Sequence, residues 1–444
     1  MTENSPFNSD EERELFGMLG VRSAEDLLAA VPPRLRETAG LALASPGFLP
    51  PAPLSADAIH SRLFPPETAS ISVSFLGGGC YFPPPLPEMR SLETWPEILF
   101  ASDCAVAELA QGTMTLLHEL QTGLAALTGL DTATCTVPDP GLALALVLLS
   151  IRERAGGARP VIVAESAPWA AARRGLGMLR HHPPAPVPLR WDASGRVDHG
   201  ELAAIARVAN PAAVVVGHPN AFGVFESLPE LRALLPPDCL VVTLCADPLS
   251  LAGAPTQSGV DLTIGDLQPL GSPPARGGET AGFVCCLRDL SDLLPGWMVA
   301  REARADGPFH AAWWPPAARP GDRDAVLRPS VVRAMLAWQI LGEAGMRDLA
   351  RRAFERRETA TRELAAVGIP PCFPTAPHGR EAAFRVPNLT QRVRHALECG
   401  VAPGVPLGPA YGSHADLAGT LLVCFDADHE PADIERLVDG VSRG

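Results

Sequence analysis

The sequence contains no lysine, and all 36 residues in its lysine-plus-arginine count are arginines. This absence excludes chemistry that starts from a lysine amine, because an ε-amine can form a Schiff base with an aldehyde cofactor and a guanidinium cannot. It also excludes a P-loop, whose motif requires a lysine. Drift from lysine to arginine at the surface explains most of the loss, but it would normally spare a lysine needed for chemistry. Any Schiff-base chemistry that involves this chain must therefore take its lysine from another polypeptide.

Other motifs of self-contained active sites are missing too. The sequence has no GxGxxG, HExxH or GxSxG segment. Its ten cysteines include no CxxC pair, and most stand among apolar neighbours, as small buried hydrophobes do. The adjacent His181 and His182 lie in a proline-rich stretch, which is more typical of a solvated loop than of a metal site. We therefore expect no bound metal.

Charge and hydropathy exclude two further classes of partner. The net charge of −14 argues against nucleic acid, since phosphate binding needs a basic face. The longest apolar run, Gly141–Ile151, is too short to span a bilayer, and the polar, acidic N-terminus is unlike a signal peptide. The length of 444 residues, 47% of them apolar, indicates a globular protein of more than one domain. We expect a cytoplasmic protein with reduced cysteines.

The alternation of strand-like and helix-like stretches predicts an α/β fold. Helices are expected at 9–17, 23–31 and 106–127, the last ending at Gly129. Strand-like stretches at 162–166 and 187–191 each precede a helical stretch, and continuous apolar runs follow at 212–218, 240–246, 261–265 and 282–287. Strands that are apolar on both faces are typical of a parallel sheet sandwiched between helices.

The pattern divides the chain into four parts. An N-terminal arm and proline-rich wrap covers 1–101, a large α/β domain covers 102–300, and a connecting loop covers 301–329. A small α+β domain over 330–444 is expected to contain helices at 333–367, 389–399 and 431–441 and strands at 383–386 and 420–425.

Several segments resemble subunit 1, the alpha chain, of the two-subunit P-protein of the glycine cleavage system. The segment SFLGGG, followed by Tyr81, is similar to the family's SFLGAGxY, and HPNAFGV at 218–224 is similar to its YPNFFGV. The segments ADPLSL and QPLG match the family in register. Further similarity lies in the N-terminal arm and at 108–113, 404–408 and 421–424, so that the match covers nearly the whole chain.

The resemblance implies a fold-type-I scaffold of the pyridoxal-phosphate transferases, with a large, mainly parallel α/β domain and a small C-terminal α+β domain. In the family the beta chain carries the Schiff-base lysine and holds pyridoxal phosphate covalently. Where that lysine would stand, this chain has Pro269 beside Gln268. The implied partners are a beta subunit in an α2β2 assembly, lipoyl H-protein and the substrate glycine. The implied reaction is glycine decarboxylation with aminomethyl transfer to the lipoyl arm.

Four residues are candidates for the site. Glu108 is the catalytic candidate, because a carboxylate in the first helical turn is stabilised by the helix dipole; an ordinary first-turn acid would look the same. Asn220, Asp247 and Gln268 are the candidates for cofactor binding at an interface cleft, since they follow strands at the edge where open α/β sheets bind ligands.

Each cofactor-binding candidate has a structural alternative. Asn220 could cap a turn, Asp247 could pair with an arginine instead of a ring nitrogen, and Gln268 could satisfy loop backbone. The glycine run at 77–79 could cradle an anion, but a permissive turn fits it better. Adjacent Trp313 and Trp314 suit loop or interface packing.

The departures from the family gather at the expected site loops. Ala105 and Val106 replace a Tyr and a Gln, and the family's YDGATA loop reads PDPGLA at 138–143, where two prolines remove backbone donors. The family's ATSNICT segment has no counterpart at 322–332. Two functions therefore stay open: a working alpha chain of glycine dehydrogenase (decarboxylating), or a catalytically degenerate paralogue kept as a scaffold or regulatory partner. The absence of lysine excludes a standalone pyridoxal enzyme.

Overall fold

The computed structural model describes residues 9–27, 29, 31–32, 54–63, 71–95, 109–179, 182–254, 258–274, 279–302, 310–314, 327–411 and 414–443. The chain forms two compact units, Met1–Thr68 and Ala69–Gly444. The first contains α1 (Ser9–Leu19), α2 (Ala24–Leu27) and α4 (Ala56–Leu63). A reciprocal capping pair begins α2, because Asp26 accepts a hydrogen bond from the Ser23 amide and its own amide donates to Ser23 Oγ.

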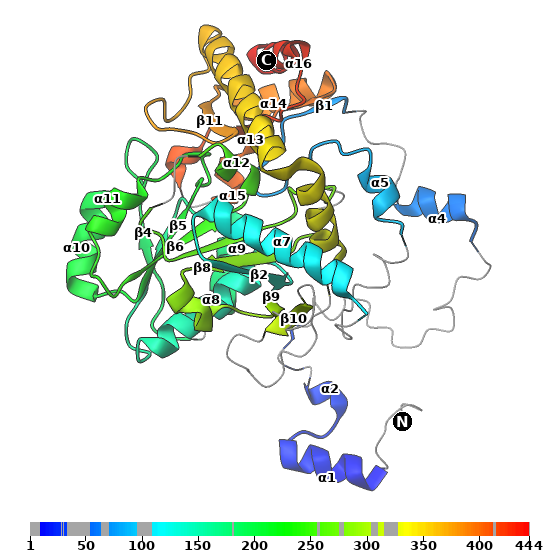
Figure 1. Ribbon diagram of the computed structural model, residues 1–444, viewed down its shortest axis with the longest axis vertical. Coiled ribbons are helices and arrows are strands. Elements are labelled where there is room, and N and C mark those ends of the chain that lie inside the picture. Colours follow the sequence, from blue (N-terminus) through cyan, green and yellow to red (C-terminus); the bar gives the residue numbers. More distant parts are fainter. Residues whose placement is uncertain are drawn as a thin grey trace. The chain divides into compact units, whose positions relative to one another are not determined.

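A seven-stranded sheet forms the centre of the second unit, in the order β2-β8-β7-β6-β5-β3-β4 (Figure 1). Only β8 runs antiparallel to its neighbours; the other pairs are parallel. The strands are β2 (Thr132–Val137), β3 (Val161–Ala164), β4 (Val187–Leu189), β5 (Ala213–Gly217), β6 (Leu240–Cys245), β7 (Leu262–Asp266) and β8 (Gly282–Cys286). The mainly parallel sheet expected from the apolar runs is confirmed.

Helices cover both faces of this sheet. On β5, Val214 and Val216 pack into one hydrophobic core and Ala213 and Val215 into the other, as the two-residue period of a strand requires. The first face is covered by α7 (Gln111–Thr128), α10 (His199–Ala209), α11 (Leu228–Ala233) and the N-terminal half of α13 (Pro329–Ala366). The second is covered by α8 (Pro140–Arg154) and α9 (Trp169–Met178).

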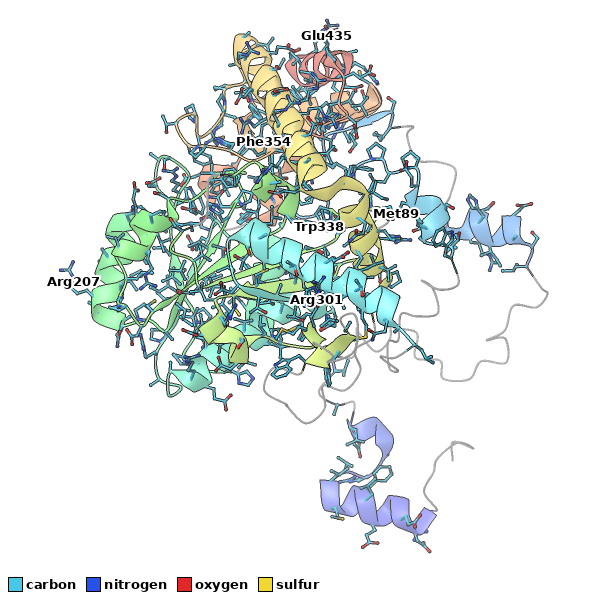
Figure 2. The ribbon with its side chains drawn as sticks, in the orientation of Figure 1. Met89, Arg207, Arg301, Trp338, Phe354 and Glu435 are labelled. Carbon is cyan, nitrogen blue, oxygen red and sulfur yellow. The ribbon has the colours of Figure 1, made fainter. Side chains whose placement is uncertain are left out.

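Helices α7 and α13 pack closely because of a glycine. A Cβ on Gly123 of α7 would lie 2.0 Å from the indole of Trp338, which projects from α13 (Figure 2). Gly129 ends α7 in the left-handed conformation, as predicted. Helix α13 is broken at Gly342, whose φ of 57° and ψ of −177° are not helical. Within the described part of the chain, no helix combines the length and apolarity needed to cross a membrane.

The C-terminal part adds a three-stranded antiparallel sheet, in the order β11-β14-β13. Its strands are β11 (Glu381–Arg385), β14 (Thr420–Cys424) and β13 (Val405–Pro406). Helices α14 (Leu389–Glu398) and α16 (Pro431–Ser442) pack on it, together with the end of α13. Strand β1 (Val73–Ser74) pairs with β12 (Val401–Ala402) and joins the segment after residue 70 to this layer.

Shorter elements complete the chain. They are α5 (Met89–Leu92), α12 (Pro248–Ala252), α15 (Leu407–Ala410), the 3₁₀ helices Arg288–Leu293 and Ala415–Leu417, and the hairpin of β9 (Met298–Glu302) and β10 (His310–Trp314).

Candidate functional site

The three predicted cofactor-binding residues lie along one edge of the central sheet. Asn220 follows β5, Asp247 follows β6 and Gln268 follows β7, and these strands are neighbours. The carboxyl ends of parallel strands are where open α/β sheets bind ligands. All three side chains are buried, with 2%, 1% and 0% of their surfaces exposed. Their function therefore depends on which atoms they contact.

Asn220 organises the turn after β5. Its Nδ2 donates to Gly195 O at 2.7 Å and to Glu226 Oε1 at 3.0 Å, and its Oδ1 accepts from the amides of Phe222 and Val224. Burial raises the pKa of the Glu226 carboxyl to about 7. These contacts agree with the alternative that Asn220 caps a turn, because every polar atom of its side chain forms a hydrogen bond to the protein itself.

Gln268 fixes an extended segment against the end of β7. Its Oε1 accepts from the Tyr81 amide at 2.9 Å, and its Nε2 donates to Tyr81 O at 2.7 Å and to Ser272 O at 2.6 Å. The side-chain amide thus pairs with the backbone of Tyr81 as a neighbouring strand would. Its predicted contact with a cofactor stays a prediction, as does that of Asn220.

Asp247 pairs with an arginine from the C-terminal layer. Arg380 donates from Nε and Nη2 to the two carboxylate oxygens of Asp247 at 2.8 and 2.9 Å, and Ser250 Oγ donates to Oδ2 at 2.5 Å. Arg380 also donates from Nη1 to Asp426 Oδ1 at 2.5 Å. Asp247 and Arg380 expose only 1% and 2% of their side chains. Such a bidentate, buried pair joins the central sheet to the C-terminal sheet. A cofactor role for Asp247 also stays a prediction.

The glycine run at 77–79 serves a close approach to Glu381. The Glu381 Oε1 accepts from the Gly78 amide at 2.7 Å, and its Oε2 accepts from the Tyr81 hydroxyl at 2.9 Å. A Cβ on Gly77 would lie 2.2 Å from that Oε1. Gly78 is therefore bonded to a carboxyl of this chain, which agrees with the turn interpretation and not with an anion cradle.

Burial raises the pKa of Glu381 to about 7, and the nearby Asp247 carboxylate raises it further. The unfolded chain ionises this group near pH 4.5 while the folded chain keeps it protonated, so its stabilising contribution is lost as the pH rises to about 7. We expect Glu381→Gln to flatten the dependence of the unfolding free energy on pH between these values. Urea unfolding at pH 5 and pH 8 measures this, with exposed Glu398→Gln as the control. An unchanged pH dependence in Glu381→Gln would contradict the assignment.

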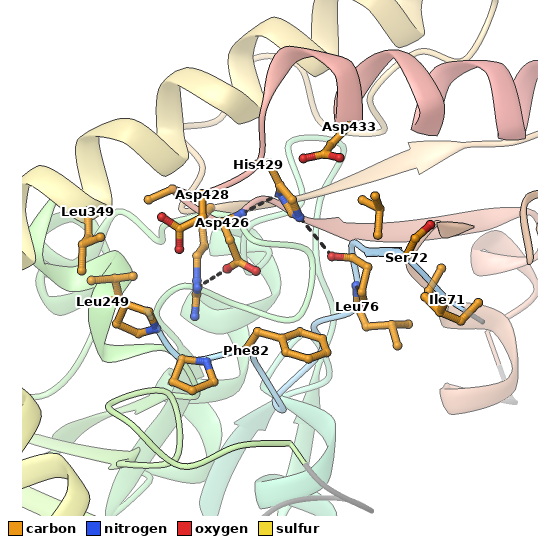
Figure 3. Close-up of a pocket in the computed structure, with 17 residues that line it drawn as sticks. Ile71, Ser72, Leu76, Phe82, Leu249, Leu349, Asp426, Asp428, His429 and Asp433 are labelled. Atoms are coloured by element: carbon orange, nitrogen blue, oxygen red, sulfur yellow. Dashed lines mark hydrogen bonds and ion pairs between the residues drawn. The ribbon is translucent and has the colours of Figure 1, made fainter. Parts of the chain in front are cut away.

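A groove of about 550 Å³ lies beside the Arg380–Asp426 pair (Figure 3). Its apolar lining includes Leu76 and Phe82, and its polar lining includes Asp428 and Asp433. The ring of His429 accepts from the Asp426 amide through Nδ1 at 3.0 Å, so its Nε2 carries the proton toward Ser74 O at 3.0 Å. These bonds hold the segment of β1 along the groove.

The start of α8 is formed by the segment 138–143, in which this chain departs from the family's YDGATA loop. Asp139 caps this helix and accepts from the amides of Gly141 and Leu142 at 2.8 and 3.0 Å. It also pairs with Arg174 at 3.2 Å, and Pro140 occupies the first helical turn. A helix N-terminus is a common phosphate site, but here the carboxylate of this chain already occupies it.

The residues at the carboxyl ends of the central strands and at the start of α8 do not fit pyridoxal phosphate as a resident cofactor. The chain has no lysine for a Schiff base. The carboxylate that could pair with a ring nitrogen is bound by Arg380, and the amides that could bind a phosphate are bound by Asp139. The strand-end cavity beside them measures only about 170 Å³.

Several predicted positions lie outside the described residues. They include Glu108, Ala105, Val106, His181 and 322–326, and the side chain of Trp313 is outside them as well. Conversely, the sequence reasoning missed Tyr81, Arg380, Glu381 and Asp426 as parts of the buried network. The one local signal was the charged pair Arg380–Glu381 at the start of a strand that is otherwise apolar as far as Phe384.

Comparisons with known proteins identify the family to which this sequence is similar. The family model of the glycine cleavage system P-protein matches residues 4–309. The probable glycine dehydrogenase (decarboxylating) subunit 1 of Thioalkalivibrio sulfidiphilus is 28% identical and covers 98% of both chains. The protein of the same description in Anaeromyxobacter sp. is 30% identical and covers 98% of this chain and 99% of its own.

Solved structures confirm the fold-type-I architecture. A glycine decarboxylase (P-protein) of the glycine cleavage system, in inhibitor-bound form, is 24% identical, with a TM-score of 0.75 over 99% of both chains. A NifS-like protein is 12% identical, with a TM-score of 0.59 over 83% of this chain and 98% of its own. Because the family model spans most of the sequence and the relatives match it end to end, this chain belongs to the glycine cleavage system P-protein family.

Proposed function

We propose that the chain is the alpha subunit of a P-protein and completes the active site of a lysine-bearing beta subunit. The observation that carries the proposal is the buried Arg380–Asp247 pair in a chain without lysine, because it leaves no resident cofactor site at the strand ends. A family member of this kind contributes to glycine chemistry through an interface. The relatives named subunit 1 support the existence of a second subunit.

In this proposal the complex is a cytoplasmic α2β2 heterotetramer, an oxidoreductase of glycine catabolism that is inactive when either subunit is missing. Pyridoxal phosphate is bound covalently by the beta subunit. The complex decarboxylates glycine and passes the aminomethyl group to lipoyl H-protein. Asn220, Asp247 and Gln268 are proposed to lie beside the interface cleft, where they hold its wall through the contacts described above.

The test is glycine–bicarbonate exchange with lipoyl H-protein, catalysed by the beta subunit with and without this chain. The proposal expects exchange only when both subunits are present. Equal exchange by the beta subunit alone, or by this chain alone, would contradict it.

The second candidate is a catalytically degenerate partner, and the start of α8 favours it. Pro140 stands where the family's YDGATA loop has a backbone donor, and Leu142 stands where that loop has a hydroxyl donor. This candidate predicts a stable complex with the beta subunit that shows no gain in exchange. It also predicts a second alpha chain, closer to the family pattern, in the same genome.

Glu108 provides a residue-level prediction for the first candidate. We expect Glu108→Ala to lower glycine turnover by the complex by about 10²-fold or more, the usual contribution of a positioned acid or base, without dissociating the subunits. Glu119→Ala, which removes a carboxylate of α7 that bonds Gln339, is the control and should keep near-normal turnover. Full activity in Glu108→Ala would remove this residue from the site.

A further inference from the structure

A small cavity at the strand ends contains a buried carboxyl group that the contacts described above leave unused. The cavity measures about 170 Å³ and lies beside the ends of β6 and β7 and the start of α8. Its walls are largely apolar and include Pro140, Leu244 and Ile264. At about 30 Å³ for each water molecule in the liquid, this space suits a ligand of only a few heavy atoms.

Asp266 supplies the polar group of the cavity. Its Oδ1 accepts from the amides of Gln268 at 2.9 Å and Ala281 at 3.4 Å. Its Oδ2 has no partner among the described residues, although Asp266 is only 5% exposed and lines the cavity. Oδ2 therefore faces the cavity, and the hydrogen bonds from the two backbone amides to Oδ1 fix the orientation of the carboxyl group.

The cavity supplies little positive charge to this carboxyl. Among the described lining residues the one cation is Arg174, which is half exposed and pairs with Asp139 at 3.2 Å. The other titratable groups nearby are Asp139 and the thiols of Cys80 and Cys245. Burial raises the pKa of Asp266 to about 7. A buried carboxylate without a counter-charge is energetically costly. A cation that entered the cavity would supply that counter-charge and would therefore be bound by Asp266.

We propose that this cavity binds a small primary ammonium ligand. The ammonium donates to Asp266 Oδ2, and the apolar part of the ligand contacts Leu244 and Ile264. A simple amine and a small amino acid share this chemistry, and the carboxylate of an amino acid would meet Arg174 at the rim. The site belongs to this chain alone and does not depend on the proposed function.

Calorimetric titration of the full-length chain tests the site with methylamine, glycine and acetate. Methylamine should bind and acetate should not; glycine binding in addition identifies an amino-acid site. For a carboxyl with a pKa of about 7, the ionised fraction rises about tenfold from pH 6 to pH 8, so ammonium affinity should rise about tenfold. If neither methylamine nor glycine binds at pH 8, or if acetate binds as well as they do, the proposal is overturned.

Two variants separate the site from general stability. Asp266→Asn keeps an oxygen for the two amides and removes the charge, so at pH 8 it should weaken ammonium binding by at least about tenfold, the usual contribution of a hydrogen bond to a charged group. Asp261→Asn is the matched control at the other end of β7, where Asp261 accepts from the Val241 amide at 2.7 Å, and it should bind normally. Ala171→Leu fills the cavity from α9 with Asp266 intact and should also abolish binding.

Alkylation of Cys80 gives a second readout that needs no variant. Cys80 lines the cavity, whereas Cys399 is exposed elsewhere. Bound methylamine should slow the reaction of Cys80 with iodoacetamide and leave that of Cys399 unchanged, as peptide mass spectrometry can measure. Equal rates at saturating methylamine, or binding by Asp266→Asn equal to that of the unmodified chain, would overturn the proposal.

Discussion

Arg380→Met is expected to lower the free energy of unfolding by about 3 to 5 kcal/mol, the usual cost of removing one partner from a buried ion pair. The substitution leaves Asp247 and Asp426 without their shared guanidinium. It also removes the cation that lies 4.6 Å from the centre of the Tyr81 ring. Asp247, whose side chain is only 1% exposed, is then left without a counter-charge, and Asp426 at the groove loses its ion pair.

Urea unfolding measures this loss, and Arg385→Met is the matched control. Arg385 lies on the same strand, β11, but its side chain is exposed and bonds mainly to backbone carbonyls. Its removal should cost less than about 1 kcal/mol, as for most surface positions. Adding Asp247→Asn to Arg380→Met should recover part of the stability, because the two positions are coupled. Equal losses in the Arg380 and Arg385 variants would contradict the buried network.

Gly223→Ala is the second change expected to have a large effect, at roughly 2 to 5 kcal/mol from left-handed strain and overpacking together. Gly223 has a φ of +81°, and a Cβ there would lie 2.1 Å from the backbone oxygen of Glu381. The turn after β5 and the start of β11 are also linked by the bond from the Gly379 amide to Gly223 O. The new methyl group would force these two backbones apart.

Gly156→Ala is the control that separates the cost of the steric contact at position 223 from the cost of the left-handed backbone. Gly156 has a similar φ of +76°, but nothing lies within 4 Å of the position of its Cβ. It should lose only the left-handed cost of about 1 to 2 kcal/mol. The difference between the two variants in denaturant unfolding measures the contact with Glu381. If both lose the same amount, the close approach has no energetic consequence.

The strands of the central sheet could be predicted because burial on both faces gives continuous apolar runs. The same property hid the direction of β8, since an antiparallel strand buried on both faces has the same composition as a parallel one. Helix α8 was seen only as an apolar run, because a helix buried nearly all round loses its polar face. Strand β2, rich in threonine, was not predicted, and neither was the break at Gly342 within α13.

For the candidate site, the positions of the residues could be predicted from the sequence, but their hydrogen-bond and ion-pair partners could not. The edge position of Asn220, Asp247 and Gln268 followed from where their strands end. Their partners did not, because Arg380 is 133 residues from Asp247 and Tyr81 is 187 residues from Gln268. A local pattern shows that a polar group will be buried, but only the folded topology shows which distant group satisfies it.

The pairing of Gln268 with Tyr81 has a consequence for how the chain responds to solution conditions. Both partners are neutral amide groups, so neither acid, base nor added salt changes their charge. The neighbouring bonds through Glu381 and Arg380 involve ionisable groups and respond to such changes. The hydrogen bonds between Gln268 and Tyr81 therefore persist when the ionic contacts weaken. They keep the segment around Tyr81 bound to the end of β7 across a wide range of pH.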